Sequence, residues 1–193
     1  MLRLVLLRHG QTQWNMAGKL QGWRDSSLTP QARRQLMSLP RTLLQNSVIY
    51  TSDLGRAQAT ARIVANTTGS YIVTDCRLRE RCFGDLDGQM IVPHSNGNCH
   101  WQAYHQRYLT PIVAIPGAET DTQLENRIRQ WLDAIPDVYR GKTVLVISHG
   151  EWLRALKNIV SGIPSWQQGE GIAVNGQPTV IHWYKKSGNA LRN

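Results

Sequence analysis

Two short motifs that contain histidine follow the two most apolar short segments of the chain. Residues 8–10 (Arg-His-Gly) come directly after segment 2–7, and residues 148–150 (Ser-His-Gly) come directly after segment 143–147. Short continuous apolar runs are typical of strands that are buried on both faces of a parallel sheet. Open α/β sheets bind ligands at the carboxyl ends of their strands. We therefore expect the two motifs to meet in space, where two imidazoles and a guanidinium would favour either a metal ion or a phosphate group.

The surrounding residue types separate these two alternatives. A metal site would need further histidine or carboxylate ligands at helical spacing, such as H-x-x-x-H, and neither His9 nor His149 belongs to such a pattern. A phosphate site needs cations, and the arginine guanidinium is a planar set of donors that matches phosphate oxygens. Arg8 and Arg56 both stand near predicted strand ends. The residues therefore favour a phosphate site over a metal site.

A histidine in a cationic pocket can also react with phosphorus. A neutral imidazole nitrogen attacks the phosphoryl group and forms a phosphohistidine, which divides one displacement into two steps. Nearby cations stabilise the charge on the transferring oxygens. The leaving oxygen then needs a proton, and Glu80, in the loop after the third predicted strand, is a candidate general acid if its pKa is raised. These considerations alone do not choose between His9 and His149 as the nucleophile.

The elements that position these residues alternate between strands and helices. A threonine and a proline at 29–30 provide an N-cap and a first helical residue, and Pro40 is expected to disturb the helix that they begin. An Asn-Gly pair at 175–176 predicts a hairpin between the last two strands. The order predicts an α/β fold of three α/β/α layers around a mostly parallel sheet. The expected strands are 2–7, 48–51, 71–73, 143–147, 171–174 and 179–183, and the expected helices are 29–44, 57–65, 101–109, 119–135 and 151–160.

The length of the chain is that of one ordinary domain. It has 193 residues, of which 41% are hydrophobic and 18% charged, which is typical of a soluble globular protein. We expect one domain over 1–193. The periodicity weakens between 84 and 115, where glycine, proline and asparagine interrupt it, so we interpret 84–115 as a loop-rich insert, hereafter the insert.

The charge and the cysteines limit the class of partner. A formal net charge of +9 favours an anionic partner, but the basic residues are scattered, which argues against nucleic acid. The apolar start is too short for a membrane span or a signal-peptide core. Cys76, Cys82 and Cys99 are odd in number and form no C-x-x-C pair, so we expect free thiols and a cytoplasmic location.

An ordered set of motifs along nearly the whole chain resembles the histidine phosphatase superfamily, also called the phosphoglycerate mutase-like family. The signature is residues 7–15, Leu-Arg-His-Gly-Gln-Thr-Gln-Trp-Asn. A lone Arg-His-Gly would be weak evidence for the family, but the further motifs follow in the same order as in the family. They are 22–25 with 28–29, 51–61, 78–80 with 83–84 and Gly88, 116–119, and 146–150. The resemblance implies a phosphoglycerate mutase-like fold.

The resemblance also implies roles for the reacting groups. His9 would be the nucleophile that is phosphorylated, and Glu80 would be the proton donor and acceptor. In a phosphatase, Glu80 would protonate the leaving alcohol and then assist water in attacking the phosphohistidine. An unprotonated His9 and a protonated Glu80 predict an acidic to neutral working range.

Four further residues would bind the phosphoryl group by the same resemblance. Arg8 and Arg56 would clamp the phosphate, His149 would stabilise the transferring group, and Asn15 matches the motif asparagine near the phosphate. The resemblance implies neither a metal nor an organic cofactor.

The fate of the phosphoryl group depends on the insert. Mutases of the family carry a longer insertion after the catalytic glutamate, with a Tyr-Gly-Gly-Leu-Asn-Lys-type motif and an arginine pair that hold the substrate carboxylate. Here that stretch is 82–88, and no arginine pair follows before Pro116. We therefore expect a phosphatase for a small phosphomonoester whose alcohol is selected by residues 89–115. The candidates are a sugar phosphate, a nucleotide-like phosphate such as α-ribazole phosphate, or a phosphoprotein. Mutase-type transfer, or a module that binds a phosphorylated ligand without turnover, remains an alternative.

Overall fold

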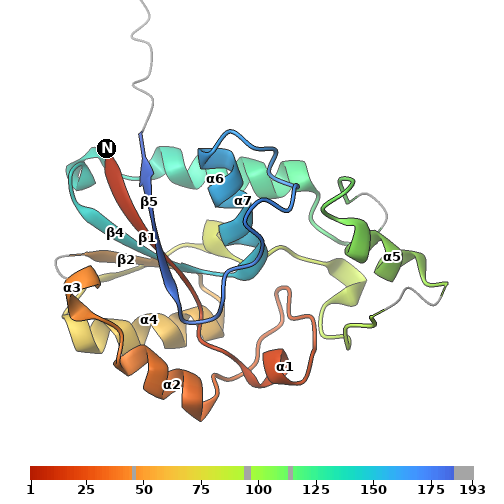
Figure 1. Ribbon diagram of the computed structural model, residues 1–193, viewed down its shortest axis with the longest axis horizontal. Coiled ribbons are helices and arrows are strands. Elements are labelled where there is room, and N and C mark those ends of the chain that lie inside the picture. The colour runs from red at the N-terminus through yellow and green to blue at the C-terminus, as the bar shows by residue number, and fades with distance from the viewer. Residues whose placement is uncertain (45–46, 94–96, 113–114, 185–193) are drawn as a thin grey trace, which may run out of the picture.

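The computed structural model describes residues 1–44, 47–93, 97–112 and 115–184, and its described strands form one central sheet (Figure 1). The strand order is β3-β2-β4-β1-β5. Neighbours from β3 to β1 are parallel, and only β5 is antiparallel, to β1. The predicted mostly parallel sheet is confirmed. The strands are β1 (Leu2–Arg8), β2 (Val48–Thr51), β3 (Ile72–Thr74), β4 (Thr143–Ser148) and β5 (Pro178–Trp183).

Helices cover both faces of the sheet (Figure 1). Along β1, Leu4 and Leu6 pack with residues of α6 (Asp121–Ala134) and α7 (Gly150–Val160). The alternate residues Val5 and Leu7 pack with the helices of the opposite face, because successive side chains of a strand point to opposite faces. These helices are α2 (Pro30–Met37), α3 (Arg41–Leu44) and α4 (Gly55–Thr68). The predicted three layers are confirmed.

The helix that begins after Thr29 shows why local sequence predicts this part of the fold. The Thr29 hydroxyl accepts a hydrogen bond from the Ala32 amide at 3.1 Å, and Pro30 occupies the first helical position. The helix ends at Ser38, and a separate short helix, α3, begins immediately after Pro40. The expected disturbance at Pro40 is confirmed, because a proline lacks the amide hydrogen that a continuing helix needs.

The predicted hairpin around 175–176 is wrong. Residues 171–174 form no strand, and β5 pairs with β1 instead of with its own neighbours in sequence. The segment before β5 is held at the carboxyl end of β1, where the Gly176 amide donates to the Arg8 carbonyl at 3.0 Å. The turn residues therefore connect α7 to the free edge of β1 rather than closing a hairpin.

The insert packs around a small apolar cluster, in which Trp101 and Tyr104 of the insert meet Leu20 and Phe83 from outside it. It contains a short 3-10 helix, η2 (Gly84–Leu86), and α5 (Cys99–Gln106), while 94–96 and 113–114 lie outside the described residues. Gly84 has a φ of +58°, and a β-carbon there would lie 1.9 Å from the Pro116 carbonyl oxygen. The two ends of the insert thus meet so closely that only glycine fits.

Three short helices complete the described elements. They are α1 (Gln13–Met16) and the 3-10 helices η1 (Cys76–Leu78) and η3 (Asp137–Tyr139). Among the described helices, none has the length and hydrophobicity to cross a membrane. Cys76, Cys82 and Cys99 are free thiols, as expected.

Candidate active site

The two histidine motifs lie side by side at the carboxyl end of the sheet. Strands β1 and β4 are parallel neighbours with Arg8 in register with Ser148, so His9 and His149 leave the sheet together. Their ring centroids are 5.1 Å apart, and both side chains are at most 2% exposed. The juxtaposition expected from the two apolar segments is therefore present.

The hydrogen bonds of His9 fix its tautomer. Nδ1 lies 2.8 Å from the Gly10 carbonyl oxygen, which can only accept, so Nδ1 carries the proton. The lone pair of Nε2 then accepts from Nε of Arg56 at 3.2 Å. Burial, followed by the charges of Arg56 and Arg8, lowers the pKa of His9 well below its usual value. The ring is therefore neutral at neutral pH, with its nucleophilic nitrogen next to a cation.

The guanidinium of Arg56 is held by the loop that precedes α2. Its Nη2 donates to the Gly22 carbonyl at 2.7 Å, and its Nη1 donates to the Arg24 carbonyl at 2.7 Å. Asp25 pairs with Nη1 at 3.3 Å and also accepts from the Arg56 backbone amide. Burial lowers the pKa of Arg56, while Glu80 and Asp25 oppose this change; the group stays charged because an arginine is not deprotonated in proteins. Asp25 thus fixes both the side chain and the start of α4.

Arg8 and His149 keep buried polar atoms unpaired. Nη1 of Arg8 donates to the Ala173 carbonyl at 2.9 Å, but the buried Nε has no partner among the described residues. Neither ring nitrogen of His149 has one, and burial together with the Arg56 charge lowers the pKa of His149 well below its usual value. Buried polar groups are almost always hydrogen-bonded. These atoms fit a bound anion with several acceptor oxygens, such as a phosphate.

Glu80 reaches the beginning of α7 from the loop that follows η1. Oε2 accepts from the Glu151 amide at 3.3 Å, and Oε1 accepts from the Trp152 amide at 3.2 Å and the Arg81 amide at 2.9 Å. The side chain keeps some exposed surface because it lines a cavity, yet protein atoms surround its carboxyl group. This burial, and then the charge of Glu151, raises the pKa of Glu80. Glu80 therefore lines the cavity with a carboxyl group whose pKa is raised, as a proton donor requires.

A cavity of about 150 Å³ joins these groups. Five of the six predicted site residues line it; the sixth, His149, does not, but its ring centroid is 5.1 Å from that of His9. The side-chain oxygen of Asn15 accepts from the amide and hydroxyl of Thr12, which leaves the Asn15 amide nitrogen for a ligand. The five lining residues are Arg8, His9, Asn15, Arg56 and Glu80.

Much of the remaining cavity wall comes from residues that sequence reasoning missed. Ile91, Tyr104 and Arg107 reach it from the insert, and Lys19 and Ile172 reach it from two other loops. The insert carried no recognised motif, so only its position after Glu80 signalled a role in binding the alcohol.

The Asn-Gly pair at 175–176 was the other missed signal. Asn175 belongs to the site through a hydrogen bond from its Nδ2 to the His9 carbonyl at 2.9 Å. The same pair of residue types predicts a hairpin turn, so the local pattern gave no indication of the contact with His9.

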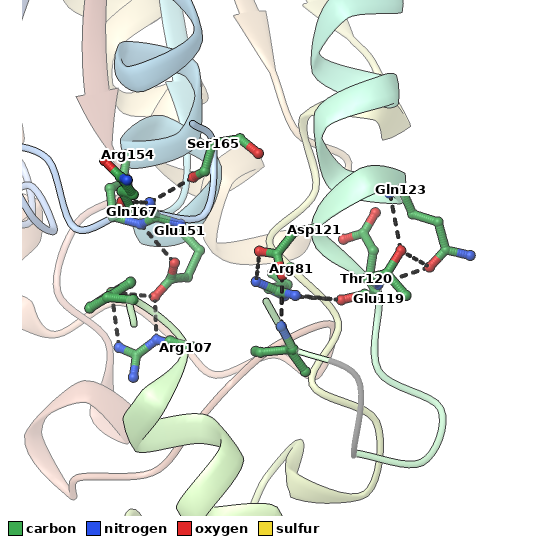
Figure 2. A network of polar contacts seen from close by, with 12 residues as sticks. Arg81, Arg107, Glu119, Thr120, Asp121, Gln123, Glu151, Arg154, Ser165 and Gln167 are labelled. Carbon is green, nitrogen blue, oxygen red and sulfur yellow. Dashed lines mark hydrogen bonds and ion pairs between the residues drawn. The ribbon is translucent and has the colours of Figure 1, made fainter. Parts of the chain in front are cut away.

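The insert is tied to the site through Glu151. Figure 2 shows the Glu151 carboxylate between Arg107 and Arg154. Oε1 is 2.8 Å from Nε of Arg107 and accepts from the Tyr108 hydroxyl at 2.6 Å, and Oε2 is 2.9 Å from Nε of Arg154. Burial would raise the pKa of Glu151, but Arg107 and Arg154 outweigh it and lower the pKa. Glu151 thus stays ionised and anchors the insert on α7. In the described part of the chain, no group of three histidine, cysteine or acidic residues is arranged to hold a metal ion.

Comparisons with known proteins match most of the chain. Residues 4–192 match the family model of the histidine phosphatase superfamily (branch 1). A protein named probable phosphoglycerate mutase GpmB, from Escherichia coli O1:K1 / APEC, is 33% identical over 172 residues, which cover 87% of this chain and 79% of that protein. The structure of YhfR from Bacillus stearothermophilus is 30% identical with a TM-score of 0.81, covering 94% of this chain and 91% of that one.

A mycobacterial glucosyl-3-phosphoglycerate phosphatase is also similar in structure. It is 26% identical with a TM-score of 0.76, covering 93% of this chain and 89% of that one. The family model spans nearly all of the sequence, and the cavity lies where the family motifs meet. The chain belongs to the histidine phosphatase superfamily.

Proposed function

We propose that this protein is a metal-independent phosphatase that hydrolyses a small phosphomonoester through a phosphohistidine on His9. The observation that carries the proposal is the fixed neutral tautomer of His9, whose Nε2 lone pair faces the Arg56 guanidinium in a cavity that Arg8 and Glu80 also line. A neutral nitrogen nucleophile beside fixed cations suits phosphoryl transfer, in which catalysis consists mainly of positioning and charge stabilisation.

In the first step, Nε2 of His9 attacks phosphorus and the bond from phosphorus to the ester oxygen breaks. Arg8 and Arg56 line the cavity beside His9 and bind the phosphoryl oxygens. The unpaired ring nitrogens of His149, whose ring centroid is 5.1 Å from that of His9, support the transferring group next to them. Glu80 gives its proton to the leaving oxygen. The proton stays on Nδ1, hydrogen-bonded to the Gly10 carbonyl, so the phosphohistidine keeps its orientation.

In the second step, water displaces His9 from phosphorus. Glu80, now ionised, takes a proton from the attacking water, and the bond between nitrogen and phosphorus breaks. Inorganic phosphate leaves, and both His9 and Glu80 return to their starting states. The net reaction converts one phosphomonoester and one water into an alcohol and phosphate.

The insert favours water as the acceptor. A mutase must retain its intermediate, and the family's mutases hold the substrate carboxylate with an arginine pair. Arg107 is the only arginine within 84–115, and its Nε, Nη1 and Nη2 atoms each already donate one hydrogen bond, to Glu151, the Tyr104 carbonyl and the Tyr108 hydroxyl. With no second arginine in the insert sequence to grip a carboxylate, the alcohol is expected to leave before water attacks. Free thiols in the described residues also fit a reducing, cytoplasmic setting.

The relative named as a phosphoglycerate mutase keeps mutase-type transfer as the second candidate. The test compares wild type, His9→Ala and the matched control His182→Ala, which changes an exposed histidine on β5. Wild type and the control are expected to release phosphate from p-nitrophenyl phosphate, and His9→Ala is not. Equal hydrolysis by all three would overturn the proposal. Isomerisation of 3-phosphoglycerate faster than its hydrolysis would establish the mutase instead, and phosphate binding without turnover would establish a binding module.

A further inference from the structure

The segment that carries Glu80 is held by side chains rather than by regular secondary structure. After η1 ends at Leu78, residues 79–80 belong to no helix or strand. Arg127, from α6, donates through Nη1 to the Arg77 carbonyl at 2.8 Å and to the Arg79 carbonyl at 2.6 Å. Its Nη2 donates to the Glu80 carbonyl at 3.0 Å. One guanidinium therefore binds three of the four carbonyls that lead to the candidate proton donor.

The guanidinium of Arg127 is itself fixed by a carboxylate. Glu119 accepts from Nε at 2.6 Å and from Nη2 at 2.7 Å, and both side chains are mostly buried. An arginine has five N–H donors, and these five contacts use all of them. A lysine, with three donors on a flexible stem, could not reproduce the set.

The remaining contacts to this segment do not replace Arg127. The fourth carbonyl, that of Leu78, accepts from the Ser148 hydroxyl at 2.8 Å. Indole groups supply second donors to the first and last carbonyls, from Trp152 to Arg77 at 2.8 Å and from Trp23 to Glu80 at 2.7 Å. Only the Arg79 carbonyl, directly before Glu80, has Arg127 as its single side-chain partner among the described residues.

We propose that Arg127 is a positioning residue for Glu80, so that it governs proton transfer to the leaving alcohol without touching the phosphoryl group. The inference rests on the proposed function. Arg127 does not line the cavity, whereas the Glu80 carboxyl depends on the backbone of its segment to reach the amides of Glu151 and Trp152. Misplacement of a reacting group by about 1 Å costs about 100-fold in rate.

Two substrates whose leaving groups differ in their need for a proton can distinguish this role from general structural support. Glycerol 2-phosphate releases an alcohol that needs a proton, whereas p-nitrophenyl phosphate releases a phenolate that leaves without one. The ratio kcat/KM reports the steps up to loss of the alcohol. Arg127→Met is expected to lower kcat/KM by about 100-fold for glycerol 2-phosphate and by less than about threefold for p-nitrophenyl phosphate, and Glu80→Gln is expected to show the same selectivity.

The matched control is Arg129→Met, which lies on the same helix but is exposed and pairs with Glu125. Arg129→Met is expected to leave kcat/KM unchanged for both substrates. Arg127→Lys retains the charge beside Glu119 but not the five donors, and it is expected to show the same selective loss of kcat/KM for glycerol 2-phosphate. This variant provides the test if Arg127→Met fails to fold. Equal losses on both substrates, or no loss on either, would overturn the role of Arg127. Hydrolysis by wild type that persists in His9→Ala would instead overturn the proposed function.

Discussion

The Nε atom of Arg56 lies 3.2 Å from Nε2 of His9, so the guanidinium donates to the nitrogen that we assign as the nucleophile. The contact occupies the Nε2 lone pair, while the Gly10 carbonyl holds the proton on the other nitrogen. In the proposed reaction, the phosphoryl oxygens take over the Arg56 donor, which frees the lone pair to attack. A positive charge at this point also lowers the pKa of His9. In the proposed function Arg56 therefore has two roles: it keeps the nucleophile neutral, and it stabilises the charge that develops on the transferring group.

Arg56→Lys is predicted to lower kcat/KM for p-nitrophenyl phosphate by about 100- to 1,000-fold, the usual effect of removing a fixed donor from a transition state. A lysine keeps the charge but cannot also reach the carbonyls of Gly22 and Arg24. The matched control is Arg62→Lys on the same helix, where the side chain is exposed and bonds Gln58. Steady-state kinetics of both variants check the prediction, and a change of less than threefold for Arg56→Lys would refute the assigned role.

The pH dependence follows from opposite shifts at two groups. The reactive form has His9 neutral and Glu80 protonated. Because the pKa of His9 is lowered, His9 remains neutral well into the acidic range; because the pKa of Glu80 is raised, the rate is lost only as pH rises through that higher value. Activity should therefore be highest at acidic to neutral pH.

Profiles of kcat/KM for glycerol 2-phosphate measure these two limits. In Glu80→Gln the remaining activity is predicted to lose its decline at high pH, since the titrating acid is gone. A wild-type rate that is flat from roughly pH 4 to 9 is incompatible with this acid–base assignment.

The insert is predicted to control affinity for the alcohol rather than the chemistry. Ile91 lines the cavity and is 37% exposed, so Ile91→Ala should fold normally. Each buried methylene contributes about 0.8 kcal/mol, so KM for p-nitrophenyl phosphate should rise roughly three- to tenfold at unchanged kcat. Val138→Ala, at an exposed position outside the cavity, is the control. Inhibition by inorganic phosphate should be unaffected in both; an equal weakening of phosphate inhibition would place Ile91 in the phosphate site instead.

A buried ion pair at the base of the insert predicts a stability effect. Arg81 is fully buried and pairs with Asp121 at 2.7 Å, and Asp121 also accepts from the Ile112 amide at 2.8 Å (Figure 2). Asp121→Ala leaves a buried charge without its partner, so the free energy of unfolding should fall by about 3–5 kcal/mol. Arg129→Ala breaks an exposed pair and should change it by less than about 1 kcal/mol. Urea unfolding measures the free energy of unfolding of both variants. Equal losses would contradict the claim that the buried pair contributes more to stability than the exposed one.

The sequence predicts those parts of the site whose positions follow from strand order. Two buried apolar segments in a parallel sheet must end at the same edge, so His9 and His149 could be placed together before any coordinates. The helix break at Pro40 follows equally from local chemistry.

Contacts between segments far apart in sequence could not be predicted in this way. The Asn-Gly turn at 175–176 has the same local signature whether it closes a hairpin or crosses the end of β1, and only the free edge of that strand decides. The pairing of Arg107 with Glu151 depends on how the insert folds back, for which no periodic pattern exists. Glu119 and Arg127 lie two helical turns apart, but nothing in that spacing reveals the carbonyls that they hold.

Trapping of the phosphoenzyme tests the central claim most directly. Wild-type protein is mixed with phosphate-labelled substrate and quenched in denaturant at alkaline pH, where phosphohistidine survives, and the labelled peptide is then identified. The proposed function predicts an acid-labile phosphoryl group on His9, its absence in His9→Ala, and its presence in His182→Ala. Hydrolysis that proceeds with the label on His149, on another residue or on none would contradict the assignment of His9 as the nucleophile.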